Sequence, residues 1–208
     1  LTPSLSDNAQ TSNADVTSEA IYWQGTYAIT DKLNATLGVR KSDDESDYTI
    51  EMTTTSPGIP FVQVPGKWSE VLEFGSTDPK LVLDYSFNEN TMGYVSVSSG
   101  YKSGGFSFAT WSESESRGGF NEEELDATEI GVKYKSSDNR LVVNAAYYEY
   151  DYTDQQQQII VVTQSGSLAG KTFNAGESEM TGFELETKYA ITDNTQIDFN
   201  YYSSDTSF

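Results

Sequence analysis

Apolar and polar side chains alternate with a period of two along much of this chain. Apolar or aromatic residues occupy every second position of Leu33–Val39 and of Leu81–Phe87, and the positions between them are largely polar. Such alternation predicts β-strands that have two unlike faces. Similar alternation marks five further runs: Ile21–Ile29, Glu129–Tyr134, Leu141–Tyr147, Phe183–Tyr189 and Ile197–Tyr201.

Short polar segments separate these runs in pairs. They are residues 30–32, 88–90, 137–139 and 192–194, and each contains Asp or Asn. Asp and Asn suit tight turns because their side chains bond the nearby backbone and tolerate left-handed conformations. The pattern therefore predicts an all-β, antiparallel, up-and-down fold of four hairpins, with about eight or more strands.

The connections between hairpins are long and differ in composition. They cover roughly residues 42–75, 102–123 and 153–176, and the third contains the four consecutive glutamines 155–158, which we interpret as a polar strand extension or, less favoured, a sugar contact. Short turns on one rim and long loops on the other are typical of an outer-membrane β-barrel.

The two strand faces differ in the solvent they need. Glu129, Lys133, Glu184 and Lys188 lie in mid-strand on one parity and require water, whereas the other parity is apolar. A closed barrel with a wet lumen satisfies both faces and every backbone group. We therefore expect the aliphatic residues on the convex face and the charges on the concave face. Aromatic residues beside the turns fit an interfacial girdle: Tyr27, Tyr85, Phe87, Tyr94, Tyr134 and Tyr189.

Composition narrows the function classes. The 208 residues carry a net charge of −20 and contain no Cys and no His. The charge opposes binding to nucleic acid, and the missing side chains remove thiolate metal sites and the commonest general base. No apolar stretch is long enough for a transmembrane helix. The chain starts without Met or a leader, so we expect a mature chain or a fragment.

A secreted all-β domain is the alternative. A sandwich or repeat adhesin also uses period-two strands, with one face on a core and one in water. A passive porin-like channel or a small anchor barrel would share the membrane pattern as well. The asymmetry of the two rims and the tyrosines beside the turns favour the membrane barrel.

Several segments resemble the barrel of TonB-dependent outer-membrane receptors. They are Ser96–Phe108 with its Gly-Tyr-Lys-Ser-Gly-Gly-Phe sequence, Ala127–Gln158, Phe173–Phe208 and Gln24–Arg40, and they follow the order of that family. The resemblance implies a 22-stranded barrel with an N-terminal plug domain. It implies import of an iron-siderophore complex, cobalamin or another scarce solute across the Gram-negative outer membrane, powered through the TonB system.

The chain departs from that family in length and in lacking a plug. Residues 1–208 are too few for 22 strands, so we expect one partial barrel domain that forms an open, curved sheet. Expected partners are membrane lipid on the outer barrel face, a small-molecule ligand such as a metal chelate, and TonB through the missing plug.

Candidate chemistry is confined to the loops. The loop at 102–123 carries four aromatic side chains and an arginine that could cradle a ligand or fold the loop on itself: Phe106, Phe108, Trp111, Arg117 and Phe120. The acidic run 43–47 lacks the Gly and distal Glu of an EF-hand, so a solvated charge cluster is favoured over a Ca²⁺ site. The chain has no nucleophile–base pair, so we expect neither an enzyme nor a cofactor.

Overall fold

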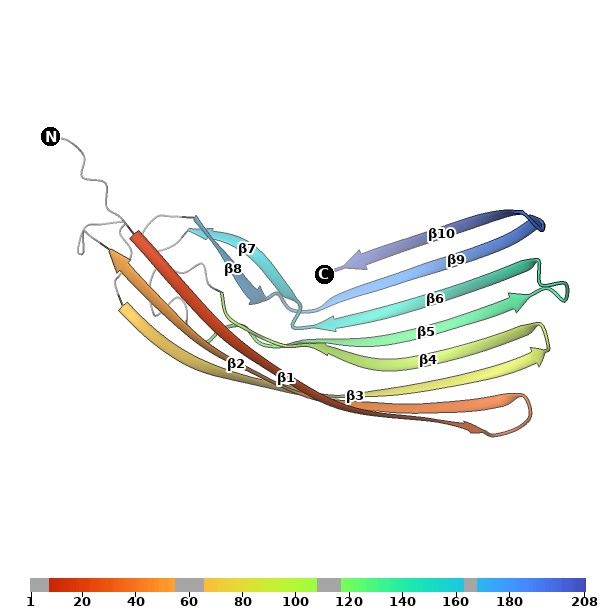
Figure 1. The fold of residues 1–208 in the computed structure, drawn as a ribbon, viewed down its shortest axis with the longest axis horizontal. Helices are drawn as coiled ribbons and strands as arrows, with labels where there is room; N and C mark the ends of the chain where they lie inside the picture. The colour runs from red at the N-terminus through yellow and green to blue at the C-terminus, as the bar shows by residue number, and fades with distance from the viewer. Residues whose placement is uncertain (1–7, 55–65, 108–116, 163–167) are drawn as a thin grey trace.

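The chain forms a long, curved antiparallel sheet with a small hairpin at one end (Figure 1). The computed structural model describes residues 8–54, 66–107, 117–162 and 168–208. The sheet has eight strands in the order β1-β2-β3-β4-β5-β6-β9-β10, and β7 pairs with β8 alone. The strands are β1 (Asn8–Ala28), β2 (Leu33–Thr54), β3 (Gly66–Asn88), β4 (Thr91–Lys102), β5 (Glu123–Lys135), β6 (Leu141–Thr153), β7 (Gln156–Val162), β8 (Leu168–Asn174), β9 (Ser178–Thr192) and β10 (Thr195–Ser207).

The four predicted turns are confirmed, and all lie on one rim of the sheet (Figure 1). Hydrogen bonds between side chains and the nearby backbone stabilise these turns, as the sequence predicts. Asn88 Oδ1 accepts the Asn90 N–H at 2.9 Å, and Asp138 Oδ1 accepts the Arg140 N–H at 3.1 Å. Asn139 has φ 61°, the left-handed conformation that Asn tolerates. Hydrogen bonds from the Ser136 hydroxyl and the Arg140 amide lower the pKa of Asp138 below its usual value.

The predicted loop over residues 42–75 is wrong, because most of it is strand. β2 continues to Thr54 and β3 begins at Gly66, and residues 8–20, to which the pattern assigned no strand, belong to β1. In these extensions the outer parity of β2 is polar and exposed, as at Asp43, Glu45 and Asp47. The apolar parity seen nearer the turns is therefore lost there, so the period-two signal fades although the ladder continues from Asn8↔Thr54 to Ala28↔Asn34.

The third predicted connection, residues 153–176, is also wrong as an unstructured loop. It contains the β7–β8 hairpin, which projects from the rim opposite the turns (Figure 1). Three of the four glutamines begin β7 rather than extending β6. The second connection, between Lys102 and Glu123, lies between β4 and β5 as predicted.

The cross-strand register places the aliphatic and charged residues on opposite faces. Leu37 lies opposite Leu81, Ile130 opposite Val95, and Leu185 opposite Ala145, so one face is apolar across the sheet. On β3 and β5 the carboxylates of the charged face, Asp84 and Glu129, are half-buried, whereas Leu83, Ile130 and Val132 of the apolar face are exposed. Side chains crowd on the concave side of a curved sheet, which makes the polar face concave. We call it the inner face.

The exposed apolar face carries most of the predicted girdle. Tyr27, Tyr85 and Phe87 are exposed on it beside the turns. Tyr94 is the exception, because it lies on the inner face, where its hydroxyl donates to Glu129 Oε1 at 2.5 Å. Its placement corrects the prediction of an interfacial role. The described residues contain no helix, hence none of a length and apolarity that would cross a membrane.

Candidate functional site

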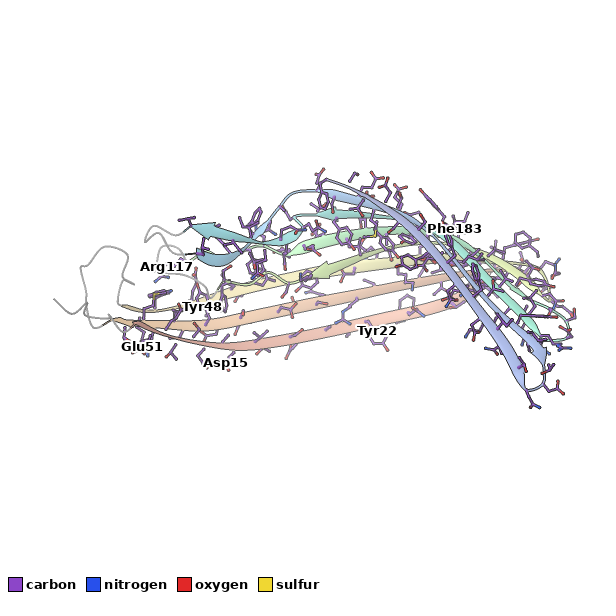
Figure 2. All side chains as sticks on the ribbon, turned by 90° about the horizontal axis from the view of Figure 1, so that it is seen from above. Asp15, Tyr22, Tyr48, Glu51, Arg117 and Phe183 are labelled. Carbon is purple, nitrogen blue, oxygen red and sulfur yellow. The ribbon has the colours of Figure 1, made fainter. Side chains whose placement is uncertain are left out.

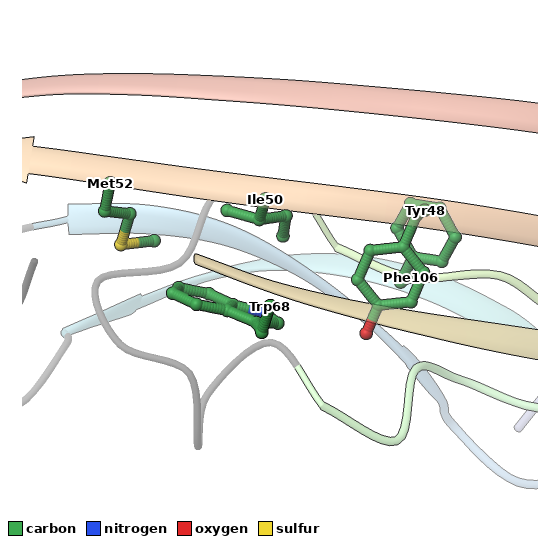
Figure 3. Close-up of a cluster of buried hydrophobic side chains, with 5 residues drawn as sticks. All are labelled: Tyr48, Ile50, Met52, Trp68 and Phe106. Carbon is green, nitrogen blue, oxygen red and sulfur yellow. The ribbon is translucent and has the colours of Figure 1, made fainter. Parts of the chain in front are cut away.

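Buried apolar side chains gather at the loop end of the inner face (Figure 3). Tyr48, Ile50 and Met52 of β2 are at most 1% exposed, and Trp68 of β3 packs beside them. Even-numbered residues of both strands point to the same face, so the cluster is a direct product of the period-two ladder. It gives the end of the sheet a firm platform above the apolar band.

The segment after β4 packs on this platform. The Phe106 ring stacks on the Tyr48 ring with centroids 3.6 Å apart and planes inclined by 24°. The Tyr48 hydroxyl donates to Glu70 Oε2 at 2.7 Å. Burial, followed by this hydrogen bond, raises the pKa of Tyr48. Tyr48 is therefore a neutral donor at any physiological pH, and it fixes the carboxylate of Glu70.

A short bridge closes the base of the same loop. Gly105 and Phe120 exchange backbone hydrogen bonds of 3.0 and 2.7 Å. Gly119, beside Phe120, has φ +56°, and a Cβ there would lie 2.2 Å from the Gly105 carbonyl oxygen. A side chain would be both strained and blocked at that position, so a glycine is required. The two ends of the loop thus leave the sheet side by side.

Arg117 marks the point where this loop returns to the described part of the chain. Its side chain is exposed and lies near the loop end of the sheet, beside Tyr48 (Figure 2). The adjacent Gly118 N–H donates to Glu70 Oε2 at 3.3 Å. Glu70 therefore receives hydrogen bonds from Tyr48 and from the Gly118 backbone, which links the returning loop to β3.

Two amide side chains attach the β7–β8 hairpin to the two ends of the loop between β4 and β5. Asn174 Nδ2 donates to the carbonyls of Asn121, Glu122 and Asp154 at 2.8–3.3 Å, and its Oδ1 accepts the Asn121 N–H at 2.8 Å. Its cross-strand partner Gln156 donates to the carbonyls of Lys102, Ser103 and Asn121 at 2.9–3.4 Å. We call this pair the amide clamp.

The evidence for the protein family extends over the whole chain and does not depend on a single residue. The model of TonB-dependent receptor-like β-barrels matches residues 1–208. The chain belongs to that family. Its sheet therefore corresponds to a section of a TonB-dependent receptor barrel, and the four tight turns form one rim of that section (Figure 1).

Solved TonB-dependent receptors share this fold. The ferric yersiniabactin uptake receptor FyuA from Yersinia pestis is 22% identical and superposes with a TM-score of 0.75, covering 96% of this chain and 28% of that one. The siderophore receptor PiuA from Acinetobacter baumannii is 23% identical with a TM-score of 0.70, covering 94% of this chain and 26% of that one. The chain thus spans between a quarter and a third of these receptors, and the likeness concerns the fold.

The predicted loop residues fall into three groups. Phe106 is packed against Tyr48, and Phe120 is half-buried at the bridge to Gly105. Arg117 is exposed. Phe108 and Trp111 lie outside the described residues. Their ligand-binding role stays a prediction, and the structure adds that two of the aromatic side chains hold the base of the loop.

The acidic run 43–47 lies within β2 rather than in a loop. Asp44 points to the inner face and receives a hydrogen bond from the Tyr101 hydroxyl, whereas its neighbours Asp43 and Glu45 point to the other face. Among the described residues no group of three or more acidic side chains is placed to hold a metal ion.

Sequence reasoning missed the amide clamp and the platform around Tyr48. The alternation Tyr48-Thr-Ile50-Glu-Met52 was available as a strand signal, although it fell within a segment read as loop. Asn174 and Gln156 left no comparable signal, because an amide that bonds distant carbonyls looks like any polar loop residue in the sequence.

Proposed function

We propose that this chain is part of the barrel wall of an active transporter in the Gram-negative outer membrane. The transporter binds a scarce solute, such as an iron-siderophore complex or cobalamin, at its outer loops and imports it. A plug domain outside these residues would relay energy from the TonB system. Family membership over residues 1–208 supports this reading, as do solved relatives described as siderophore and ferric-catecholate receptors.

A single observation carries the proposal beyond the family: the loop between β4 and β5 is anchored on the inner face at the end opposite the turns. Phe106 stacks on Tyr48, the Gly105–Phe120 bridge closes its base, and the amide clamp binds both of its flanks. Recognition residues commonly lie on loops whose ends are fixed to a rigid scaffold. Of the five predicted residues, Phe106 and Phe120 hold the base of the loop, and Phe108, Trp111 and Arg117 are the proposed ligand-facing set, with Trp111 and Arg117 first.

The secreted-sandwich alternative loses support from the same structure. No second sheet packs on the eight-stranded sheet within the described ranges. Large apolar side chains such as Ile130 and Phe199, each 55% exposed, cover the convex face. Lipid is the surrounding that stabilises such a face.

The test is growth of a receptor-deficient strain on the cognate iron chelate or other scarce solute. The complementing gene encodes the full-length receptor with residues 107–119 replaced by a Gly/Ser linker that has glycine at position 119, so that the Gly105–Phe120 bridge and Phe106 are kept. We expect loss of uptake at normal receptor levels in the outer membrane. Uptake at the unmodified rate would remove this loop from the ligand site and leave the connection between β2 and β3 and the β7–β8 hairpin as candidates.

A further inference from the structure

The convex apolar face is hollowed close to the turn rim. A groove of about 630 Å³ crosses β3, β4, β5 and β6 there and reaches β9. Small side chains form its floor, because Gly93, Val132 and Ala145 are successive partners across the ladder. The next row of partners away from the turns carries larger side chains: Leu83, Val95, Ile130 and Tyr147.

Aromatic pairs stand at the two ends of this groove. Toward the turns, the Tyr85 and Phe87 rings meet edge to face with centroids 5.2 Å apart. The Phe87 ring lies over Gly93, where a Cβ would approach it to 2.9 Å. At the other end, Tyr147 lies directly opposite Phe183 in the ladder. The rings act as walls, so the groove has a definite shape on a face that is otherwise open.

The lining of the groove fits a hydrocarbon chain. Its side chains are apolar except for tyrosine hydroxyls. Because we place this face in a membrane, hydrocarbon surrounds it, and van der Waals packing rather than the hydrophobic effect decides what fills a hollow. A flexible acyl chain can follow a floor that is bordered by rings, and the volume lies within the ~300–1,000 Å³ typical of small-molecule sites.

Two turns with exposed charges meet at the turn end of the groove. Lys32 directly precedes Leu33, which lines the groove, and Glu89 lies two positions after Phe87. The Ser86 N–H donates to the Lys32 carbonyl at 2.8 Å, which holds the β1–β2 turn beside the end of β3. A headgroup whose acyl chain lay in the groove would therefore reach both turns.

This part of the rim carries charges of both signs. Lys32 and Lys135 are exposed, as are Asp31 and Glu89, and none of the four belongs to an ion pair of the described residues. A headgroup with one amine and one phosphate can meet both signs. A headgroup with negative charge alone also faces the two carboxylates, and like charges brought together are unfavourable.

From the groove and this rim we infer that the wall binds one zwitterionic phospholipid of the leaflet at the turns. One acyl chain fills the groove over Gly93 and Ala145, and the headgroup lies at Lys32 and Glu89. The inference rests on the membrane placement in the proposed function. It goes beyond that function, because it assigns one lipid to one place on the outer wall.

The probe is phosphatidylethanolamine with a diazirine on one acyl chain, added to the purified full-length receptor in maltoside detergent. Illumination should attach it to the segments of β4, β5 and β6 that line the groove. Ala145→Leu should lower this labelling on the order of fivefold, because the larger side chain occupies the floor. Ala35→Leu is the matched control, since Ala35 lies on the same face, opposite Tyr27, and outside the groove. Equal labelling of both variants, each folded by its heat-dependent shift in gel mobility, would overturn the inference.

Phosphatidylglycerol with the same diazirine chain tests the headgroup on the unmodified receptor. We expect groove labelling weaker than that by phosphatidylethanolamine by roughly threefold, because like charges are brought together at the rim. Labelling of equal strength by the two lipids would contradict the zwitterionic assignment. Disulfide-linked receptor dimers formed by Ala145→Cys in whole membranes would assign the groove to a second copy of the receptor and refute the lipid.

The uptake assay separates this inference from the proposed transport. Specific labelling of the groove in a receptor that imports no solute keeps the lipid site and refutes the transport function. Solute uptake by a receptor whose groove takes up no probe refutes the lipid site and leaves the transporter.

Discussion

Glycines on the inner face are explained by the tyrosines opposite them. Gly131 lies opposite Tyr94 and Gly182 opposite Tyr148, and in each pair the ring covers the glycine. A Cβ at Gly131 would lie 2.6 Å from the Tyr94 ring, and one at Gly182 would lie 2.2 Å from Tyr148 Cζ. An aromatic ring laid over a strand glycine restores packing that the glycine lacks. The Glu-Ile-Gly and Thr-Gly-Phe sequences are therefore packing signals as well as family signals.

Gly182→Ala should lower the free energy of unfolding by about 1–3 kcal/mol, because the added methyl group must displace a ring that is only 7% exposed. The measurement is urea unfolding of the full-length receptor in lipid vesicles, followed by tryptophan fluorescence. Gly100→Ala is the matched control, since a Cβ there meets nothing within 4 Å. In a Tyr148→Ala background the cost of Gly182→Ala should vanish; an unchanged cost would assign it to the backbone instead.

Val132→Arg tests the assignment of the convex face to lipid. Val132 is exposed in the middle of β5, and a charge at the bilayer midplane costs about 2–4 kcal/mol. Asn144→Arg places the same charge on the inner face of β6, beside Glu186, and should cost little. Refolding yield of the full-length receptor, read from its heat-dependent shift in gel mobility, compares the two. A greater loss of refolding yield with Asn144→Arg than with Val132→Arg would show that the two faces are assigned the wrong way round.

At the scale of elements, the turns and the strands beside them could be predicted from sequence. Turn-forming Asn and Asp residues and the alternation of apolar and polar residues occur next to each other there. Asn88 and Asp138 close their turns with their own side chains, and each turn joins strands whose faces contact different solvents. Further along β2 the outer parity is polar as well, so Asp43, Asp44 and Glu45 follow one another without breaking the ladder.

The candidate site was predictable in location but not in contacts. The aromatic content of residues 106–120 identified the loop, whereas the stacking of Phe106 on Tyr48 depends on a strand 58 positions away in the chain. The β7–β8 hairpin was missed for a related reason. Its attachment rests on amide contacts to distant carbonyls at the two ends of the loop between β4 and β5, and such contacts have no periodicity.

Asn174→Ala should loosen the attachment of the β7–β8 hairpin, with the bonds of Gln156 remaining. The change removes the side-chain bonds to Asn121, Glu122 and Asp154 and leaves the β7–β8 ladder itself intact. Amide hydrogen exchange of residues 117–122 and 168–174 in the full-length receptor should then become faster, because local opening follows the number of anchoring contacts. Gln157→Ala is the control, since the Gln157 side chain donates to Gln155, two positions away, within the same segment. Identical exchange in both variants would contradict the clamp.

At the scale of the whole molecule, the sheet is an open arc with two edges. β1 and β10 lie at opposite ends of the strand order, and each pairs with one neighbour among the described strands. Unpaired strand edges are not tolerated in the hydrocarbon of a bilayer. The arc is therefore a wall section that requires further strands on both sides, which agrees with its match to between a quarter and a third of solved receptors.

Residues 1–208 produced alone should fail to form a closed membrane barrel. Eight-stranded barrels are narrow enough for side chains to fill their interior. Here the inner face carries Glu129, Lys133, Glu184 and the covering rings of Tyr94 and Tyr148, which need the wide, wet lumen of a larger circle. Closure would press these groups together without water and without the partners that a buried charge requires.

The measurement is cysteine cross-linking between the two edges after refolding in lipid. Gln24 of β1 and Asn200 of β10 lie on the inner face at similar distances from the turn rim, so a closed eight-stranded ring would bring Gln24→Cys and Asn200→Cys together. We expect no intramolecular disulfide and no heat-dependent mobility shift from residues 1–208. Gln24→Cys with Gly38→Cys, a directly opposed pair in the β1–β2 ladder, should cross-link under the same oxidation and shows that the reaction works. A disulfide between positions 24 and 200, accompanied by the mobility shift of a folded barrel, would establish the chain as a small barrel and return the anchor-barrel alternative to first place.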